Sequence, residues 1–173
     1  GPALRETEVR EFLAQVPDRV LVALDEAYWE FATDAEAVDG LAAFRKYDNL
    51  VLARTFSKAH GLAGLRVGYG VADAEIATAL RQVVAPFSVT TGAQAAASES
   101  LARVGEVLVR AKEVAATRDR FAADLRDLGF QLGTPEAQSA IIAVVMPDLE
   151  RGAAMWEALL KGGLYVNLAR PPA

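Results

Sequence analysis

The sequence contains no cysteine, which excludes disulfide bridges, thiolate metal sites and cysteine nucleophiles. It contains a single histidine, His60, so one chain cannot build a metal site from several histidines. Long hydrophobic runs are also missing, because the stretch from Ala140 to Met146 is far shorter than the roughly 20 residues that a membrane-spanning helix needs. We therefore expect no membrane association, and the absence of cysteine is compatible with a cytoplasmic location.

Basic residues are fewer than acidic ones. The 173 residues include 18 Lys and Arg against 23 Asp and Glu, which gives a net charge of -5. Without a long basic run, the chain lacks the electrostatic footprint of a nucleic-acid-binding protein. Hydrophobic residues make up 53% of the chain, enough to form a core and to exclude general disorder. The length fits one domain, or one large domain with part of a second.

Both ends of the sequence indicate a piece of a longer chain. Gly1 and Pro2 are typical of the residues that remain after cleavage of a purification tag, and there is no initiator Met or signal peptide. The other end stops at Ala173, directly after an apolar run. We expect the natural protein to be longer.

The first half of the chain alternates between predicted helices and short buried strands. Apolar residues at helical spacing predict one helix near the start, and a second helix is expected to be capped by Asp34. Continuous apolar runs predict strands that are buried on both faces. The predicted helices are residues 7–13 and 34–47, and the predicted strands are residues 20–24, 50–53 and 67–72.

The second half is mainly helical. The segment 91–128 is almost free of helix breakers and predicts two consecutive helices or one long bent helix. The other predicted elements are helices at 73–84 and 150–161, and strands at 130–132, 139–146 and 164–167. This order predicts an α/β fold with a mainly parallel sheet flanked by helices, followed by a small α+β C-terminal lobe. We place the domain boundary near Gly105, which gives a large-domain part, 1–105, and a small-domain part, 106–173.

Asp25 is a candidate binding residue because it follows a predicted buried strand. The carboxyl ends of parallel strands are where open α/β sheets bind ligands. An ionised carboxylate at such a place needs a cation or strong hydrogen bonds, and a protonated pyridine nitrogen would serve. Alternatively, Asp25 only caps the next helix.

Lys58 follows the next predicted strand, beside the hydroxyls of Thr55 and Ser57. A lysine whose pKa is lowered by burial can form a Schiff base with an aldehyde, and two hydroxyls can hydrogen-bond a phosphate. The alternative is an ordinary solvated lysine. Arg66 follows a glycine-rich turn, and its guanidinium suits a phosphate; otherwise it forms a surface ion pair or packs against the fold.

These residues, together with the phenol of Tyr28, match what pyridoxal phosphate requires of a protein. The segments that carry them resemble fold-type I pyridoxal-phosphate aminotransferases, in particular the histidinol-phosphate and aromatic aminotransferases. The two motifs are Leu24-Asp25-Glu26-Ala27-Tyr28 and the run Arg54-Thr55-Phe56-Ser57-Lys58-Ala59-His60-Gly61-Leu62-Ala63-Gly64-Leu65-Arg66-Val67-Gly68-Tyr69. The resemblance covers about residues 6–115.

The resemblance implies a role for each residue. Lys58 would form the imine with the cofactor and then transfer a proton between substrate and cofactor. Asp25 would keep the pyridine nitrogen protonated, and Tyr28 would donate a hydrogen bond to the ring 3-oxygen. The remaining roles are packing against the ring, for Ala27, and binding the phosphate, for Thr55, Ser57 and Arg66. The resemblance also implies amino-acid and 2-oxo-acid substrates, a part in amino-acid biosynthesis and a homodimer.

The last third of the chain, from Gly129, resembles the small domain of bacterial serine palmitoyltransferase, an α-oxoamine synthase. That resemblance places Arg170 near the substrate carboxylate. Tyr28 stands where the synthases carry a histidine, which disfavours a condensation reaction. The sequence therefore predicts an aminotransferase, of which this chain has about half the usual length of the family. The alternatives are a non-catalytic fragment or chimera of fold-type I enzymes and, less favoured, an α-oxoamine synthase.

Overall fold

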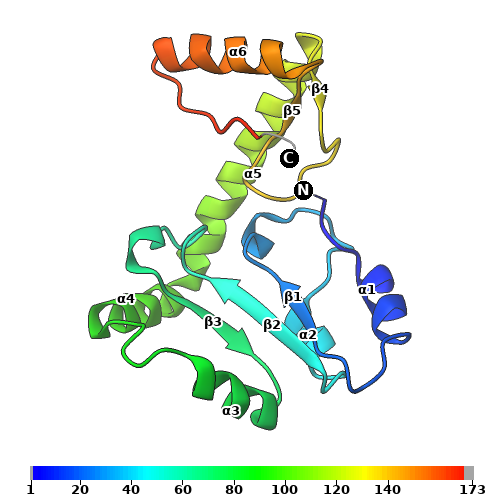
Figure 1. Cartoon of the computed structure of the whole chain (residues 1–173), viewed down its shortest axis with the longest axis vertical. Helices are drawn as coiled ribbons and strands as arrows, with labels where there is room; N and C mark the ends of the chain where they lie inside the picture. Colours follow the sequence, from blue (N-terminus) through cyan, green and yellow to red (C-terminus); the bar gives the residue numbers. More distant parts are fainter. Residues whose placement is uncertain (1, 170–173) are drawn as a thin grey trace.

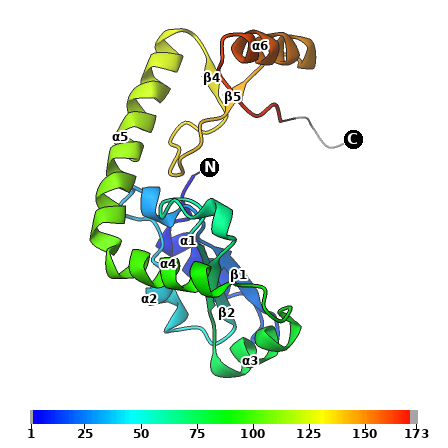
Figure 2. The same ribbon diagram turned by 90° about the vertical axis from the view of Figure 1, so that its left-hand side faces the viewer.

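A computed structural model describes residues 2–169 of the chain (Figure 1). Its first half carries a three-stranded sheet with helices around it, and its last part carries a two-stranded sheet and the final helix. The long helix α5 runs from one part to the other, as Figure 2 shows from the side. Elements of the first half are α1 (Glu6–Leu13), β1 (Val22–Asp25), η1 (Trp29–Phe31), α2 (Gly40–Phe44), β2 (Leu50–Thr55), η2 (Ala63–Leu65) and β3 (Gly68–Val71). Those of the second half are α3 (Ala74–Val83), α4 (Thr91–Ala102), α5 (Val104–Asp127), β4 (Gln131–Leu132), β5 (Val144–Val145) and α6 (Leu149–Lys161).

The larger sheet has the strand order β1-β2-β3. Strands β1 and β2 are parallel, with Asp25 opposite Ala53, so both strands end at the same edge. Strand β3 runs antiparallel to β2, with Gly68 opposite Thr55. The α/β fold is thus confirmed, but the sheet is mixed where the sequence predicted mainly parallel pairing. The connection from β2 to β3, residues 56–67, contains only the short helix η2 and not the crossover helix that usually joins parallel strands.

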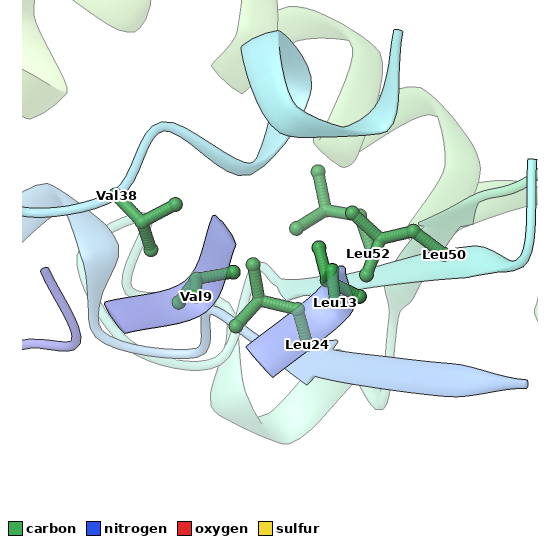
Figure 3. Packing of buried hydrophobic residues seen from close by; sticks show 6 residues of the cluster. All are labelled: Val9, Leu13, Leu24, Val38, Leu50 and Leu52. Atoms are coloured by element: carbon green, nitrogen blue, oxygen red, sulfur yellow. The ribbon is translucent and has the colours of Figure 1, made fainter. Parts of the chain in front are cut away.

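The main core lies between this sheet and α1. Leu50 and Leu52 of β2 are fully buried, and Leu24 of β1 lies beside them. Side chains from α1 and from the segment before α2 close the cluster, which Figure 3 shows as Val9, Leu13, Leu24, Val38, Leu50 and Leu52. Because every second residue of a strand points to the same face, the alternation of Leu50 and Leu52 aims both side chains into this core.

A second, smaller core supports the loop after β2. Phe56 and Val67 flank this loop and are buried against Ala93 and Ala97 of α4. The small alanine side chains let the helix approach the loop closely. The Phe56 amide donates to the Val67 carbonyl, and the Leu62 amide donates to the Phe56 carbonyl. The loop that carries Lys58 is therefore held against α4 by packing and by its own backbone hydrogen bonds.

The predicted helix at 34–47 is largely wrong, because only Gly40–Phe44 is helical. Asp34 does not cap it; its Oδ1 accepts from the Glu36 amide instead. The cap is Asp39, whose Oδ1 accepts from the Leu41 amide at 3.0 Å. The residues before α2 form a turn, in which the Ala37 amide donates to the Asp34 carbonyl, and the Asp34 amide itself donates to Oε1 of the distant Gln138.

The predicted strands of the last third are shorter than expected or missing. Residues 139–146 contain only the two-residue strand β5, and residues 164–167 contain no strand. The latter segment packs along α6 instead, where the Trp156 indole donates to the Val166 carbonyl at 3.0 Å. Between α4 and α5 the chain breaks at Arg103, which confirms two consecutive helices. Gly105, where we placed the domain boundary, lies inside α5, and the boundary itself stays a prediction.

Helix α5 is anchored to both parts of the molecule by Arg118. Its side chain is buried, and Nη1 donates to the carbonyls of Phe31, at 3.1 Å, and Ser139, at 3.3 Å. One side chain thus ties α5 both to the region of η1 and to the loop before β5. Among residues 2–169, no helix is long and apolar enough to cross a membrane.

Candidate active site

Asp25 is the last residue of β1, at the edge where β1 and β2 both end. Its Oδ1 accepts the Ala27 amide at 2.9 Å, a contact typical of an aspartate that starts a turn. The short helix η1 that follows has Tyr28 at its N-cap position and no side-chain cap, so Asp25 does not cap it. Asp25 is exposed and lines a cavity of about 330 Å³ together with Ala27 and Tyr28. The turn thus brings the carboxylate and the phenol to one cavity.

Lys58 lies in the loop that follows β2. The Ser57 amide donates to Thr55 Oγ1 at 3.1 Å, and the Gly61 amide donates to the Lys58 carbonyl at 2.9 Å. These bonds form a tight turn from which the Lys58 side chain projects. Its Nζ lies 5.1 Å from the centroid of the Tyr28 ring. The ends of two adjacent strands therefore bring the amine to the phenol, although Lys58 does not line the cavity that Asp25 shares with Tyr28.

Arg66 closes the turn between β2 and β3. It has a positive φ of 52°, a left-handed conformation that is uncommon for a residue other than glycine. Its Nη1 donates to the Ala63 carbonyl at 2.8 Å, and the residue is exposed. Gly68 follows, and a Cβ there would lie 2.8 Å from the Arg54 carbonyl, so β3 approaches β2 too closely for any larger residue. The Arg66 side chain is thus bonded within its own turn.

The structure therefore brings some of the predicted site residues together. Asp25, Ala27 and Tyr28 line one cavity, and the Lys58 amine lies beside the Tyr28 ring, so Tyr28 connects the cavity to the lysine. Arg170 lies outside the described residues. Within residues 2–169, no group of three or more His, Cys, Asp or Glu side chains is placed to hold a metal ion.

Sequence reasoning missed a buried ion pair beneath the site. Glu26 follows Asp25, and Arg54 precedes Thr55; Glu26 Oε2 lies 2.7 Å from Nη2 and 2.8 Å from Nε of Arg54. Burial raises the pKa of Glu26, against the opposing effect of Arg54. Burial also lowers the pKa of Arg54, but the hydrogen bonds and charges of Glu26 and Tyr69 together outweigh it and leave the pKa above its ordinary value.

The same pair makes further contacts with neighbouring segments. Glu26 Oε1 accepts the Gly40 amide at 2.8 Å, and the Arg54 guanidinium lies 4.4 Å from the centroid of the Trp29 ring. The pair therefore links β1, β2, the start of α2 and η1. The sequence did hold a signal for this pair: Glu26 and Arg54 have opposite charges, and each lies next to a predicted site residue at the end of a predicted strand.

Comparison with known proteins decides the family. The family model described as aminotransferase class I and II matches residues 1–173. The chain belongs to this family. The match covers both the part that resembles aminotransferases and the part that resembles serine palmitoyltransferase, so one family accounts for the whole sequence.

Curated relatives support the same assignment. The chain is 48% identical over 167 residues to an aromatic amino acid aminotransferase of Rhodococcus opacus, and the matched region covers 96% of this chain and 45% of the relative. It is 45% identical over 142 residues to an aromatic amino acid aminotransferase of Streptomyces avermitilis, covering 82% of this chain and 39% of the relative. This class I and II aminotransferase chain thus spans less than half the length of these relatives.

Solved structures confirm a partial fold-type I architecture. Histidinol-phosphate aminotransferase from Sinorhizobium meliloti, in complex with pyridoxal-5'-phosphate, matches with a TM-score of 0.85 and 27% identity, over 96% of this chain and 45% of that one. Serine palmitoyltransferase from Sphingomonas wittichii matches with a TM-score of 0.63 and 27% identity, over 95% of this chain and 50% of that one. Both resemblances noted in the sequence therefore have structural counterparts, and both extend over nearly the whole chain.

Proposed function

We propose that this chain carries part of the pyridoxal-phosphate site of an aminotransferase, with Lys58 as the residue that binds the cofactor covalently. One observation carries the proposal: the Lys58 Nζ lies 5.1 Å from the centroid of the Tyr28 ring, at the sheet edge where Asp25 ends the neighbouring strand. Membership of the class I and II aminotransferases supports it.

The donor set fits this cofactor. Asp25 offers an exposed carboxylate for a cationic ring nitrogen, and Ala27 beside it presents a small apolar side chain to the flat ring. Thr55 and Ser57 offer hydroxyls to the phosphate, and Arg66 offers a guanidinium. Together these groups supply the charges and hydrogen bonds that a phosphorylated, cationic aldehyde requires.

When bound, pyridoxal phosphate supplies an electron sink that stabilises negative charge at the substrate Cα. Asp25 would hold a proton on the ring nitrogen and so keep that sink effective. Lys58 Nζ would bind the cofactor covalently and, when free, would accept and return a proton as a general base and acid. Tyr28 would donate a hydrogen bond to the ring oxygen and hold the cofactor in place. In the net reaction, the amino group leaves one substrate as it becomes a 2-oxo acid and passes to another 2-oxo acid.

The substrate class follows from the relatives. Those described above are named aromatic amino acid aminotransferases, and we propose aromatic amino acids with their 2-oxo acids as substrates. Arg170 is proposed to bind the substrate carboxylate. We further propose a homodimer with a part in amino-acid biosynthesis. We also propose a cytoplasmic location, with which the absence of cysteine is compatible.

The test is an absorption spectrum of the chain with and without pyridoxal phosphate. The proposal predicts an imine band that persists in Lys112→Ala and disappears in Lys58→Ala. Lys112 is a matched control because it is exposed on α5, far along the chain from the site. A band that survives Lys58→Ala would contradict the assignment of Lys58.

Three outcomes decide between the alternative functions. A cofactor band without any transfer of amino groups to a 2-oxo acid would favour a non-catalytic fragment. A ketone product formed from an amino acid and an acyl thioester would favour an α-oxoamine synthase, the class of the Sphingomonas wittichii protein. Conversion of an aromatic 2-oxo acid to its amino acid would support the aminotransferase.

A further inference from the structure

A second pair of side chains joins the two segments that carry Tyr28 and Lys58. Glu30 follows Tyr28 by two residues, and His60 follows Lys58 by two residues. His60 Nε2 lies 3.6 Å from Glu30 Oε1, and the two side chains are only 4% and 7% exposed. The two segments that bring Lys58 beside Tyr28 are thus also joined, two residues further along each, by a buried contact.

His60 is also fixed on its other side. Its Nδ1 lies 2.7 Å from the Ser100 hydroxyl of α4. The His60 ring packs against the Phe56 ring, with their centroids 4.7 Å apart. Both ring nitrogens and one ring face therefore have partners, which lie in η1, in α4 and in the loop that follows β2.

These contacts leave the lysine loop little freedom. Phe56 anchors the start of the loop, and His60 anchors the residues just after Lys58. The packing around Phe56 and the loop's own backbone hydrogen bonds hold the loop backbone, but the Lys58 side chain is long and samples many rotamers unless its surroundings are fixed. Burying the polar His60 ring costs free energy that an apolar side chain in the same space would not. The geometry therefore favours a role of His60 in placing the Lys58 amine over a role in filling the core.

We propose that Glu30, His60 and Ser100 form a positioning network that holds the Lys58 amine beside Tyr28. The value of this placement rests on the proposed function, in which Lys58 binds the cofactor. The network itself is a property of the chain without cofactor. It can therefore be tested in the absence of pyridoxal phosphate.

The test measures the nuclear magnetic resonance of ¹³C-methylated lysines in the complete 173-residue chain. Methylation keeps the charge of the amine. Because Lys58 Nζ faces the Tyr28 ring, the ring current displaces the Lys58 methyl signal from that of the exposed Lys112. Tyr28→Leu defines the position of the Lys58 signal without the ring.

The proposal predicts that Glu30→Leu and His60→Phe move the Lys58 signal to its Tyr28→Leu position. His60→Phe is informative because it retains an aromatic ring against Phe56 while removing both ring nitrogens. Glu30→Gln keeps an oxygen facing His60 and is expected to retain the wild-type signal. Should the larger changes prevent folding, Ser100→Ala removes a single hydroxyl and is expected to displace the signal part of the way.

The network proposal fails if the Lys58 signal stays at its wild-type position in His60→Phe, Glu30→Leu and Ser100→Ala, whichever of these fold. It also fails if Glu30→Gln displaces the signal as far as Glu30→Leu does. These outcomes are independent of cofactor binding: a chain with the predicted signals but no imine band would overturn the proposed function alone.

Discussion

Glu26 and Arg54 form a buried ion pair that joins the ends of two parallel strands directly beneath the candidate site. Their side chains are 4% and 9% exposed, and Oε2 lies 2.7 Å from Nη2. The residues on either side of this pair are Asp25 and Thr55, both proposed to bind cofactor. The pair therefore fixes the register in which the site residues leave the sheet.

Removing Glu26 is expected to destabilise the fold strongly. Glu26→Ala leaves the Arg54 charge buried without its partner, and such changes cost about 3–5 kcal/mol in the free energy of unfolding. Urea denaturation measures the loss. Glu36→Ala is the control, because Glu36 pairs with Arg5 where the side chains are 69% and 51% exposed; its effect should stay under about 1 kcal/mol. Equal losses in the two variants would contradict the account.

Gly40 is expected to tolerate no side chain. A Cβ there would lie 2.5 Å from both Glu26 Oε1 and Leu52 Cδ1, so Gly40→Ala must displace the buried pair or the core, at about 1–3 kcal/mol. Gly105→Ala is the matched control on α5, where the added Cβ meets nothing within 4 Å. That change should stabilise the helix by about 0.5 kcal/mol. Thermal unfolding of both variants checks the opposite signs.

The region around Gly40 shows which parts of the fold the sequence could and could not predict. The strands around Leu24 and Leu52 were predictable, because a run of apolar residues is a local signal. The start of α2 at Gly40 was not, since it depends on Glu26, fourteen residues away, accepting the Gly40 amide. The turn before α2 depends on Gln138, which is still more distant and accepts the Thr33 and Asp34 amides.

The candidate site shows the same division. Its residue types and their order along the chain were readable from two motifs. Asp25 and Lys58 were each predicted to follow a buried strand, but the approach of Lys58 to the Tyr28 ring was not predicted. The partners of His60 were not predicted either, because Glu30 and Ser100 come from elements whose packing no local pattern reveals.

His60 is expected to make stability depend on pH. Burial lowers the pKa of His60 below its ordinary value of 6.5, with a further effect of Arg110. The unfolded chain therefore binds a proton more readily than the folded one, so the contribution of neutral His60 is complete above pH 6.5 and falls as the pH drops through the lowered pKa. Relative to His60→Phe, the wild type should lose its advantage as the solution is acidified.

Measuring urea denaturation of both proteins between neutral and mildly acidic pH tests this. Glu30 is present in both, and burial raises its pKa. Its protonation at acidic pH therefore favours the folded state in each protein, opposite in sign to the effect of His60. A stability difference that stays constant with pH would show that His60 has an ordinary pKa.

Arg118 is expected to couple the two parts of the molecule. Arg118→Met leaves the carbonyls of Phe31 and Ser139 without this donor in a buried place, at about 1–3 kcal/mol. Arg120→Met is the control, because Arg120 is exposed and its hydrogen bond to Thr117 lies at the surface of the same helix. Hydrogen exchange should accelerate in the segment around Ser139 in the first variant only.

The central claim is that Lys58 is the amine that binds the cofactor, and covalent trapping tests it most directly. The chain is mixed with pyridoxal phosphate, reduced with borohydride and digested, and the labelled peptides are located by mass spectrometry. The account predicts the label on Lys58, while Lys46, Lys112 and Lys161 stay unlabelled at limiting cofactor. A label spread evenly over the four lysines, or absent from Lys58, would contradict it.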